Sequence, residues 1–313
     1  MIILNKRNII LKYLILFFIL FNITACSYIE NFVYKTEISI ERFRSGFKLK
    51  ALDISDHKIT YLESGKGEVI LLVHGYTADK DIWIRFARLL KDEYRIIVPD
   101  LPGHGDSTAN MNCNYSISSQ AKYLKEFIDR LGIEKLNIVG NSMGGSISLN
   151  FTHLYQNNVK SMALFNSGGV KAPNPSEFNK LIQKGINPFI IKNKNDFKKL
   201  IDMSMSSPPF LPWPIKSVMY RNYKSKSNIF QKIYNDISND LWETKNFLPN
   251  ITIPVFILWG DNDRLIDVSC VEVFDKNISN SQAVILENIG HCPMIENPKE
   301  AVKYYKNFLS SIH

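Results

Sequence analysis

One short stretch of the sequence, Gly140-Asn-Ser-Met-Gly144, constrains the fold more than any other because of what flanks it. The apolar run 136–139 before it is typical of a buried strand, and residues 143–156 after it have a helical spacing. A serine at such a strand-to-helix corner is held in a strained conformation that exposes its hydroxyl, while glycines on either side let strand and helix approach. We therefore predict a nucleophile elbow centred on Ser142.

The rest of the chain repeats the alternation of strand and helix. This pattern predicts an α/β fold with a mostly parallel central sheet and helices on both faces. Residues 38–63 alternate in polarity and predict two or three antiparallel edge strands. Strands are expected at 69–73, 94–98, 136–139, 161–165, 255–259 and 283–286, and helices at 81–91, 116–131, 143–156 and 298–310.

The alternation breaks over residues 171–250, which contain eight prolines. A connection of about 80 residues is far longer than an ordinary loop, so we expect an inserted cap between core segments 50–170 and 251–313. The middle of this insertion, 208–215, is apolar and proline-rich, and we expect no regular helix there. Caps cover pockets, and the candidate pocket residues in this stretch are Phe210, Leu211 and Trp213.

The N-terminus has the parts of a secretory signal. Three cations lie in residues 1–12, an unbroken apolar run follows at 13–21, and Ile-Thr-Ala precedes Cys26. Ile-Thr-Ala-Cys resembles the lipobox of bacterial lipoproteins. This resemblance implies that 1–25 is a signal peptide and that Cys26 carries lipid, with 26–49 as a tether and first edge strand. An uncleaved membrane anchor is the alternative.

Both the lipoprotein signal and the uncleaved anchor place the body of the protein outside the cytoplasm, in the cell envelope and at a membrane. Ser27 follows the cysteine, and the lipoprotein resemblance then favours the outer membrane. The net charge is +8, but the basic residues of the body are interspersed with acidic ones. This distribution indicates a solvated surface and no nucleic-acid partner.

The remaining cysteines, Cys113, Cys270 and Cys292, form no CxxC pair, so a zinc site is not expected. In an oxidising compartment they allow one disulfide with one free thiol, or three thiols. The sequence leaves both possibilities open.

A serine hydroxyl becomes a nucleophile only when a base removes its proton. His291 is the candidate base, because it follows the strand 283–286 and so lies at the same sheet edge as Ser142. His74 and His104 each precede a glycine in a turn and are expected to brace loops. The acid that orients the base could be Asp261, Asp263 or Asp267, which all follow the strand 255–259. The residues alone do not choose among these three.

Acyl transfer also needs two backbone amides directed at the developing oxyanion. Met143 follows the nucleophile and supplies one amide. The turn His74-Gly75-Tyr76 follows the strand 69–73, and we assign the second amide to Tyr76.

Taken together, these motifs resemble the α/β-hydrolase family across residues 50–313. The matching pieces are His74-Gly75, Asp100-Leu-Pro-Gly-His-Gly-Asp-Ser107, Gly140-Asn-Ser-Met-Gly-Gly145, Gly260-Asp-Asn-Asp263 and Gly290-His291. In that family the acid is the fourth residue of a Gly-x-x-Asp turn, which implies Asp263. More narrowly, the chain resembles monoacylglycerol-lipase-like proteins and related bacterial lipases.

The resemblance implies a serine hydrolase that cleaves esters of lipid-like substrates, such as monoacylglycerols, through an acyl-enzyme on Ser142. This chemistry needs no metal and no organic cofactor. The alternatives are a short-chain carboxylesterase, a carbon–carbon hydrolase of the same fold, and an anchored binding protein without activity. The carbon–carbon hydrolases usually place Trp after the base, where this chain has Cys292.

Overall fold

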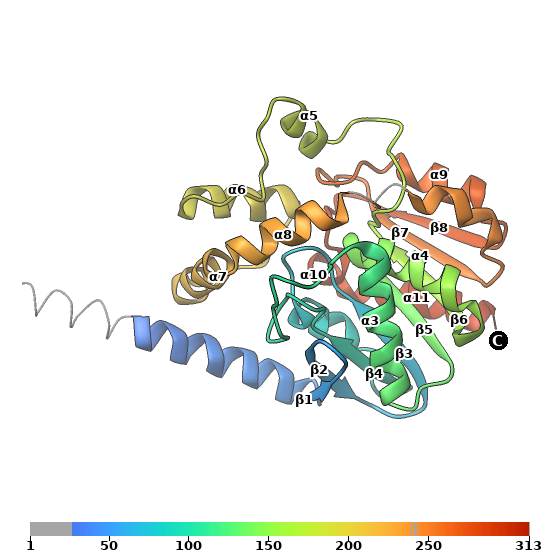
Figure 1. The fold of residues 1–313 in the computed structure, drawn as a ribbon, viewed down its shortest axis with the longest axis horizontal. Helices are drawn as coiled ribbons and strands as arrows, with labels where there is room; N and C mark the ends of the chain where they lie inside the picture. Colours follow the sequence, from blue (N-terminus) through green and yellow to red (C-terminus); the bar gives the residue numbers. More distant parts are fainter. Residues whose placement is uncertain (1–26, 239, 241–242, 313) are drawn as a thin grey trace, which may run out of the picture.

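The computed structural model describes residues 27–238, 240 and 243–312. Its centre is an eight-stranded sheet with the order β1-β2-β4-β3-β5-β6-β7-β8. β1 pairs antiparallel with β2, β2 pairs antiparallel with β4, and every later pair is parallel. The prediction of a mostly parallel α/β sheet is therefore confirmed (Figure 1).

All six strands expected in the parallel part are present, with small differences at their ends. The inner strands β5 and β7 are buried along their whole length, as parallel strands covered on both faces require, whereas the edge strand β8 is largely exposed. The strands are β1 (Lys48–Asp53), β2 (Lys58–Ser64), β3 (Glu68–Val73), β4 (Tyr94–Pro99), β5 (Leu136–Asn141), β6 (Val159–Phe165), β7 (Val255–Gly260) and β8 (Ser281–Leu286).

Helices cover both faces of the sheet, and each face has its own hydrophobic core. One core packs α3 (Ile117–Arg130), α4 (Met143–Tyr155) and α9 (Cys270–Asn277) against the sheet. The other core packs α10 (Pro293–Glu296) and α11 (Pro298–Ser311) on the opposite face. The helices predicted over 116–131, 143–156 and 298–310 are confirmed.

The helix predicted over 81–91 is wrong in its extent. The chain forms the 3₁₀ segment η1 (Lys80–Trp83) and then the single turn α2 (Ile84–Ala87). Asp79 caps η1 by accepting a 2.9 Å hydrogen bond from the Asp81 amide. Trp83, Ile84 and Phe86 still bury their side chains in the second core, which explains the helical spacing of the apolar residues.

Two antiparallel strands, β1 and β2, are present in the segment 38–63 as predicted. The predicted start at residue 38 is wrong, because residues 27–44 form a helix and β1 begins at Lys48. The side of this helix that meets the body includes Glu30, Tyr34, Ile38 and Arg42, which are spaced by four residues. Three of these four are polar or charged, so hydrophobic periodicity alone did not show the helix. The leader 1–25 and Cys26 lie outside the described residues.

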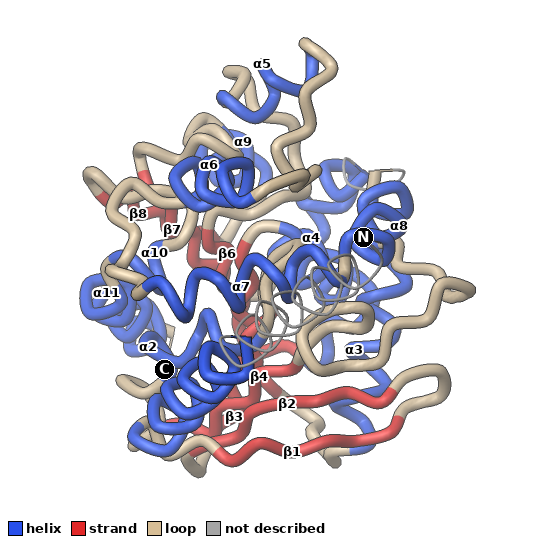
Figure 2. The backbone as a smooth tube through the Cα atoms, turned by 90° about the vertical axis from the view of Figure 1, so that its left-hand side faces the viewer, coloured by secondary structure: helices blue, strands red, loops and turns tan. Residues whose placement is uncertain are grey.

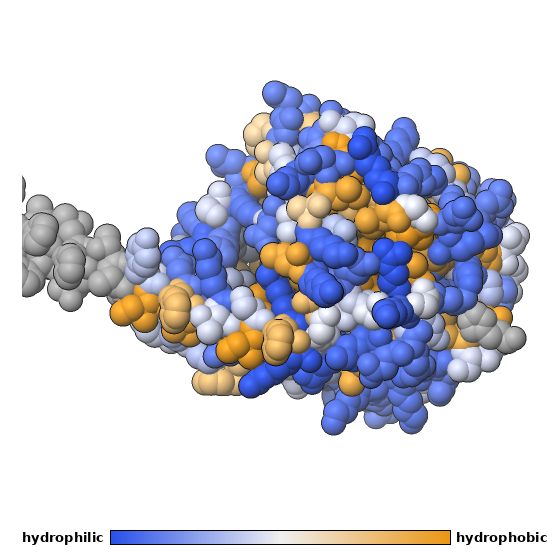
Figure 3. Space-filling model, turned by 90° about the horizontal axis from the view of Figure 1, so that it is seen from below, coloured by the Kyte–Doolittle hydropathy of each residue, from blue (hydrophilic) through white to orange (hydrophobic). Residues whose placement is uncertain are grey.

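The N-terminal helix 27–44 leaves several large apolar side chains in solvent. Tyr28, Ile29 and Phe32 are 64–81% exposed at its start, and Phe43 is 83% exposed at its end. Figure 3 shows apolar atoms along this helix. Within the described part of the chain, no helix combines the length and apolar character that crossing a bilayer would need.

In the described residues between β6 and β7, 166–238, 240 and 243–254, the chain forms four α-helices. Figure 2 shows two of them, α6 and α7, in front of the sheet. Contrary to expectation, the stretch 208–215 is partly helical: α7 begins at Trp213 and holds Pro214 in its first turn, where a missing N–H costs no hydrogen bond. The elements are α5 (Glu177–Gln183), α6 (Lys194–Ser204), α7 (Trp213–Ser225), α8 (Ser227–Ile237) and the 3₁₀ segment η3 (Glu243–Asn250).

Candidate active site

The predicted elbow joins β5 to α4. Ser142 has φ 57° and ψ −123°, a region that non-glycine residues rarely occupy and that requires support from the surrounding packing. A Cβ on Gly140 would lie 2.3 Å from the Gly144 carbonyl oxygen, and one on Gly144 would lie 2.3 Å from the Val73 oxygen. Strand and helix therefore pack closely at this corner, and side chains at both positions would separate them.

His291 and Asp263 lie side by side after the last two strands. Nδ1 of His291 is 2.7 Å from Oδ2 of Asp263, and both side chains are at least 94% buried. The other carboxylate oxygen of Asp263 accepts hydrogen bonds from the amides of Leu265 and Ile266, at 2.8 and 3.0 Å. With Nδ1 donating to the carboxylate, Nε2 of His291 is left as the acceptor.

The structure distinguishes among the three aspartates that the sequence left as candidates for the orienting acid. Among them, Asp263 contacts His291, whereas Asp261 is exposed. Asp267 turns its carboxylate to its own loop and accepts a 3.0 Å hydrogen bond from the Ser269 amide.

Ser142 and His291 line the same cavity, which has a volume of about 670 Å³. Asn141, immediately before Ser142, donates a 3.1 Å hydrogen bond to the His291 carbonyl oxygen and so ties the two loops together. In the described residues no hydrogen bond joins the Ser142 hydroxyl directly to the imidazole. Such bonds are often long in unliganded enzymes and shorten when substrate binds.

The turn after β3 packs against the elbow. A Cβ on Gly75 would lie 3.0 Å from the Ser142 Cβ, so a glycine is needed for this approach. Tyr76 follows, and its hydroxyl donates a 2.7 Å hydrogen bond to the Phe230 carbonyl oxygen of α8. Met143 is the first residue of α4, where helical amides have no acceptor inside the helix.

Two residues that we did not predict hold the acid and the base in place. Asn166, with φ 46°, donates hydrogen bonds of 2.8 Å to Asp263 and 3.3 Å to the Gly290 oxygen. Its position directly after β6, at the sheet edge that carries the other site residues, was the available signal.

Glu296 is the second such residue. Its carboxylate accepts hydrogen bonds from the amides of Gly290 and Cys292, on either side of His291. It also accepts bonds from the amides of Ser206 and Ser207, at 2.8 and 3.0 Å. Nothing in the sequence distinguished this acid from the other surface acids.

The wall of the cavity opposite Ser142 comes from the insertion, but not from the residues that we predicted. Phe210 is 90% exposed and Trp213 61% exposed, and neither they nor Leu211 belong to the cavity lining. The reason is that 206–212 is the mostly exposed connection between α6 and α7, while side chains of these two helices form most of the apolar lining. That lining includes Phe189, Phe197, Leu200, Ile201, Met205, Val218, Met219 and Tyr223.

Residues 68–189 match the alpha/beta hydrolase fold family. The chain is 34% identical over 279 residues to Lipase 1 of Psychrobacter immobilis, covering 87% of each sequence. The chain belongs to the α/β-hydrolase family.

Two further relatives of this hydrolase cover most of its length. A solved structure described as a membrane phospholipase A, a bacterial virulence factor, has a TM-score of 0.90 and 32% identity, covering 96% of this chain and 98% of that one. Monoacylglycerol lipase abhd6-A of Xenopus laevis is 28% identical over 284 residues, covering 85% and 83%. The expected fold, family and enzyme class, a carboxylic ester hydrolase, are thus confirmed.

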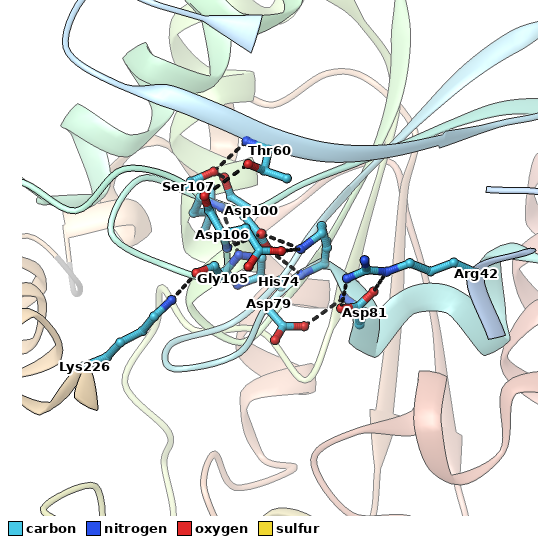
Figure 4. Close-up of polar contacts among 12 residues, drawn as sticks. Arg42, Thr60, His74, Asp79, Asp81, Asp100, Gly105, Asp106, Ser107 and Lys226 are labelled. Atoms are coloured by element: carbon cyan, nitrogen blue, oxygen red, sulfur yellow. Dashed lines mark hydrogen bonds and ion pairs between the residues drawn. The ribbon is translucent and has the colours of Figure 1, made fainter. Parts of the chain in front are cut away.

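Beside the elbow, the hydrolase buries a charged network that the sequence analysis missed (Figure 4). Lys80 Nζ lies 2.7 Å from Asp100 and 2.7 Å from Asp106. Lys80 and Asp100 are almost fully buried, whereas the Asp106 side chain is 62% exposed. Burial raises the pKa of Asp100 above its ordinary value, although Lys80 acts against this shift. The ion pair fastens the turn after β3 to the turn after β4.

The two histidines that we expected to brace loops do so. His74 Nε2 accepts a 3.0 Å hydrogen bond from the Leu101 amide, and its Nδ1 lies 2.8 Å from the Gly75 oxygen. His104 Nδ1 lies 3.1 Å from the Pro102 oxygen. Burial lowers the pKa of His74 to about 4, so this side chain is neutral at pH 7 and does not charge the site.

The three cysteines of the described residues are free thiols. Burial raises the pKa of Cys292, next to His291, above its ordinary value, so it remains protonated and is a poor nucleophile. Across the described ranges, no group of three or more His, Cys, Asp or Glu residues is arranged to hold a metal ion.

Proposed function

We propose that this hydrolase cleaves lipid-like carboxylic esters with Ser142 as nucleophile, His291 as base and Asp263 as the orienting acid. The observation that carries the proposal is the 2.7 Å contact of His291 with Asp263, beside a strained serine on the same apolar cavity. A base oriented by a buried acid and adjacent to an exposed hydroxyl is the arrangement that activates serine.

In this mechanism Nε2 of His291 takes the Ser142 proton while Oγ attacks the ester carbonyl carbon. The backbone amides of Tyr76 and Met143 stabilise the oxyanion. The tetrahedral intermediate collapses, the C–O bond to the alcohol breaks, and the alcohol leaves with the proton from His291. Water then attacks the acyl-enzyme by the same route and releases the acid.

We propose monoacylglycerols or similar acyl esters as substrates. The apolar lining of the cavity fits an acyl chain, and relatives named lipase and monoacylglycerol lipase support this class. The relative described as a phospholipase A adds phospholipids to the substrates worth testing. The short-chain carboxylesterase is the nearest alternative, since the same site would cleave small esters.

We further propose that 1–25 is a lipoprotein signal, that Cys26 carries the lipid, and that 171–250 is a cap on the core formed by 50–170 and 251–313. The body would then lie at the outer membrane, outside the cytoplasm. The exposed apolar side chains at the start of the N-terminal helix, Tyr28, Ile29 and Phe32, support a position close to lipid. A Cys26→Ser variant should lose labelling by radioactive palmitate, and unchanged labelling would contradict the lipid assignment.

The activity is tested with glycerol and nitrophenyl esters of increasing acyl length, on wild type and Ser142→Ala. We expect hydrolysis by wild type and stoichiometric labelling by a fluorophosphonate. Ser142→Ala should lose both while keeping the wild-type circular dichroism spectrum and melting temperature. Full activity of the folded Ser142→Ala variant would overturn the proposal. A preference for acetate over octanoate and longer chains would favour the carboxylesterase.

A further inference from the structure

The N-terminal helix 27–44, which the sequence suggested was a simple tether and edge strand, forms one side of the candidate substrate cavity. Six of its residues line the cavity that contains Ser142 and His291. They recur at each turn of the helix, singly or as adjacent pairs, and so lie along one of its faces. They are Asn31, Tyr34, Lys35, Ile38, Ser39 and Arg42.

The helix is attached near its start to the insertion. Glu30, whose side chain is 6% exposed, forms an ion pair with Arg221 of α7. Arg221 also donates hydrogen bonds to Ser217 on its own helix, at 2.9 Å, and to Asn31, at 3.3 Å. In Figure 1 the helix runs below α7.

Near its end the helix is attached to the core. Arg42 makes a two-pronged contact with Asp81 of η1, at 2.8 and 2.6 Å (Figure 4). Bidentate pairs of this kind fix orientation as well as distance. Asp81 lies five residues after Tyr76, the proposed oxyanion residue, so the helix is fixed on both the cap side and the catalytic side of the cavity.

Between these two attachments the helix presents Tyr34 and Ile38 to the cavity. Burial, and then the nearby Asp79 and Asp81, raise the pKa of the Tyr34 hydroxyl, so it remains neutral. Ile38 is the purely aliphatic side chain that the helix contributes, and it is half-buried. Val218 and Met219 of α7 supply apolar surface to the same cavity.

We propose that the N-terminal helix is part of the substrate site, and that Ile38 limits the length of the acyl chain that the cavity accepts. This inference rests on the proposed esterase function. A larger side chain at position 38 shortens the apolar space, whereas a smaller one extends it. The discrimination expected from a few methylene groups is about tenfold or more.

The helix itself offers a matched control. Ile40 is the same residue type two positions along, is 37% exposed, and does not line the cavity. The full chain in detergent is assayed as wild type, Ile38→Trp, Ile38→Ala and Ile40→Trp. Nitrophenyl acetate, butyrate, octanoate and palmitate vary the acyl chain, and monooctanoyl glycerol and methyl octanoate vary the alcohol.

For Ile38→Trp we expect kcat/KM for palmitate, relative to acetate, to fall about tenfold or more. Ile38→Ala should raise the same ratio, and Ile40→Trp should match wild type. The melting temperature shows that each variant is folded, and the fraction labelled by a fluorophosphonate gives the number of active sites to which every rate is referred. An unchanged ratio in both Ile38 variants, an equal change in Ile40→Trp, or a change confined to the alcohol series would overturn the inference. If wild type hydrolyses none of the esters, the proposed function fails instead.

Discussion

Asn166 donates a 2.8 Å hydrogen bond to Oδ2 of Asp263, the same oxygen that faces Nδ1 of His291. The carboxylate of Asp263 therefore has a hydrogen-bond partner besides the imidazole. A second bond from Asn166, to the Gly290 oxygen, fixes the residue before the base. Asn166 thus connects the end of β6 to the loops that carry both proposed partners of Ser142.

Asn166→Gly should lower kcat by about ten- to a hundredfold with little change in KM, because a hydrogen bond to a charged group is worth about 1.5–3 kcal/mol. Glycine accepts the positive φ of this position, so the change removes the amide without adding strain. Asn288→Gly is the matched control, since Asn288 also has a positive φ of 58° but is exposed. Equal kcat values for both variants would contradict the role of Asn166.

Asp263→Asn should lower kcat about a thousandfold or more, because an amide does not hold the imidazole in the required tautomer or stabilise its charged form. The kcat of Asp261→Asn should remain within about twofold of wild type, because the exposed Asp261 does not orient the imidazole. Steady-state kinetics on a short ester distinguishes the two. Similar losses in the two variants would show that the acid is wrongly assigned.

Glu296→Ala should lower both thermal stability and kcat. Its carboxylate accepts amides on both sides of His291, and leaving a buried amide unpaired costs about 1–3 kcal/mol. Glu296→Gln keeps an acceptor and should lose less. The control is Glu287→Ala, which changes an exposed acid in the loop that carries His291 and should melt at the wild-type temperature. If Glu287→Ala lowers the melting temperature and kcat as much as Glu296→Ala does, the hydrogen bonds of Glu296 are not the cause of its effect.

Lys80→Met should destabilise the fold by about 3–5 kcal/mol, because it leaves the Asp100 carboxylate buried without its cation. Asp106→Asn removes the exposed partner of the same lysine and should cost less than about 1 kcal/mol. Urea unfolding at pH 7 measures both. A loss for Asp106→Asn as large as that for Lys80→Met would mean that the buried contact is not the dominant one.

The sequence predicted the sheet well, because parallel strands buried on both faces need continuous apolar runs, and β3, β5 and β7 have them. It also located the elbow, since only glycine fits at positions 140 and 144. Both features depend on residues that are close together in the sequence, so a short stretch is enough to show them.

Features that depend on partners distant in the sequence were missed. The N-terminal helix is held by Glu30 and Arg42, whose partners lie at Arg221 and Asp81, and no local pattern shows such pairs. The pocket wall was assigned to Phe210 and Trp213 because they are apolar, yet the path of the chain turns them to solvent. The hydrophobicity of a side chain indicates that its burial is favourable, but it does not show whether the folded chain buries it.

The position of the helix 27–44 has a practical consequence for work with shortened proteins. Removing an N-terminal segment up to the first strand is one way to prepare a shorter protein for assays. In this protein a truncation at β1 would remove Tyr34, Ile38 and Arg42 together, and with them one face of the chamber around Ser142. Selectivity measured on that shortened protein would describe a wider, more open chamber than the one the intact chain has.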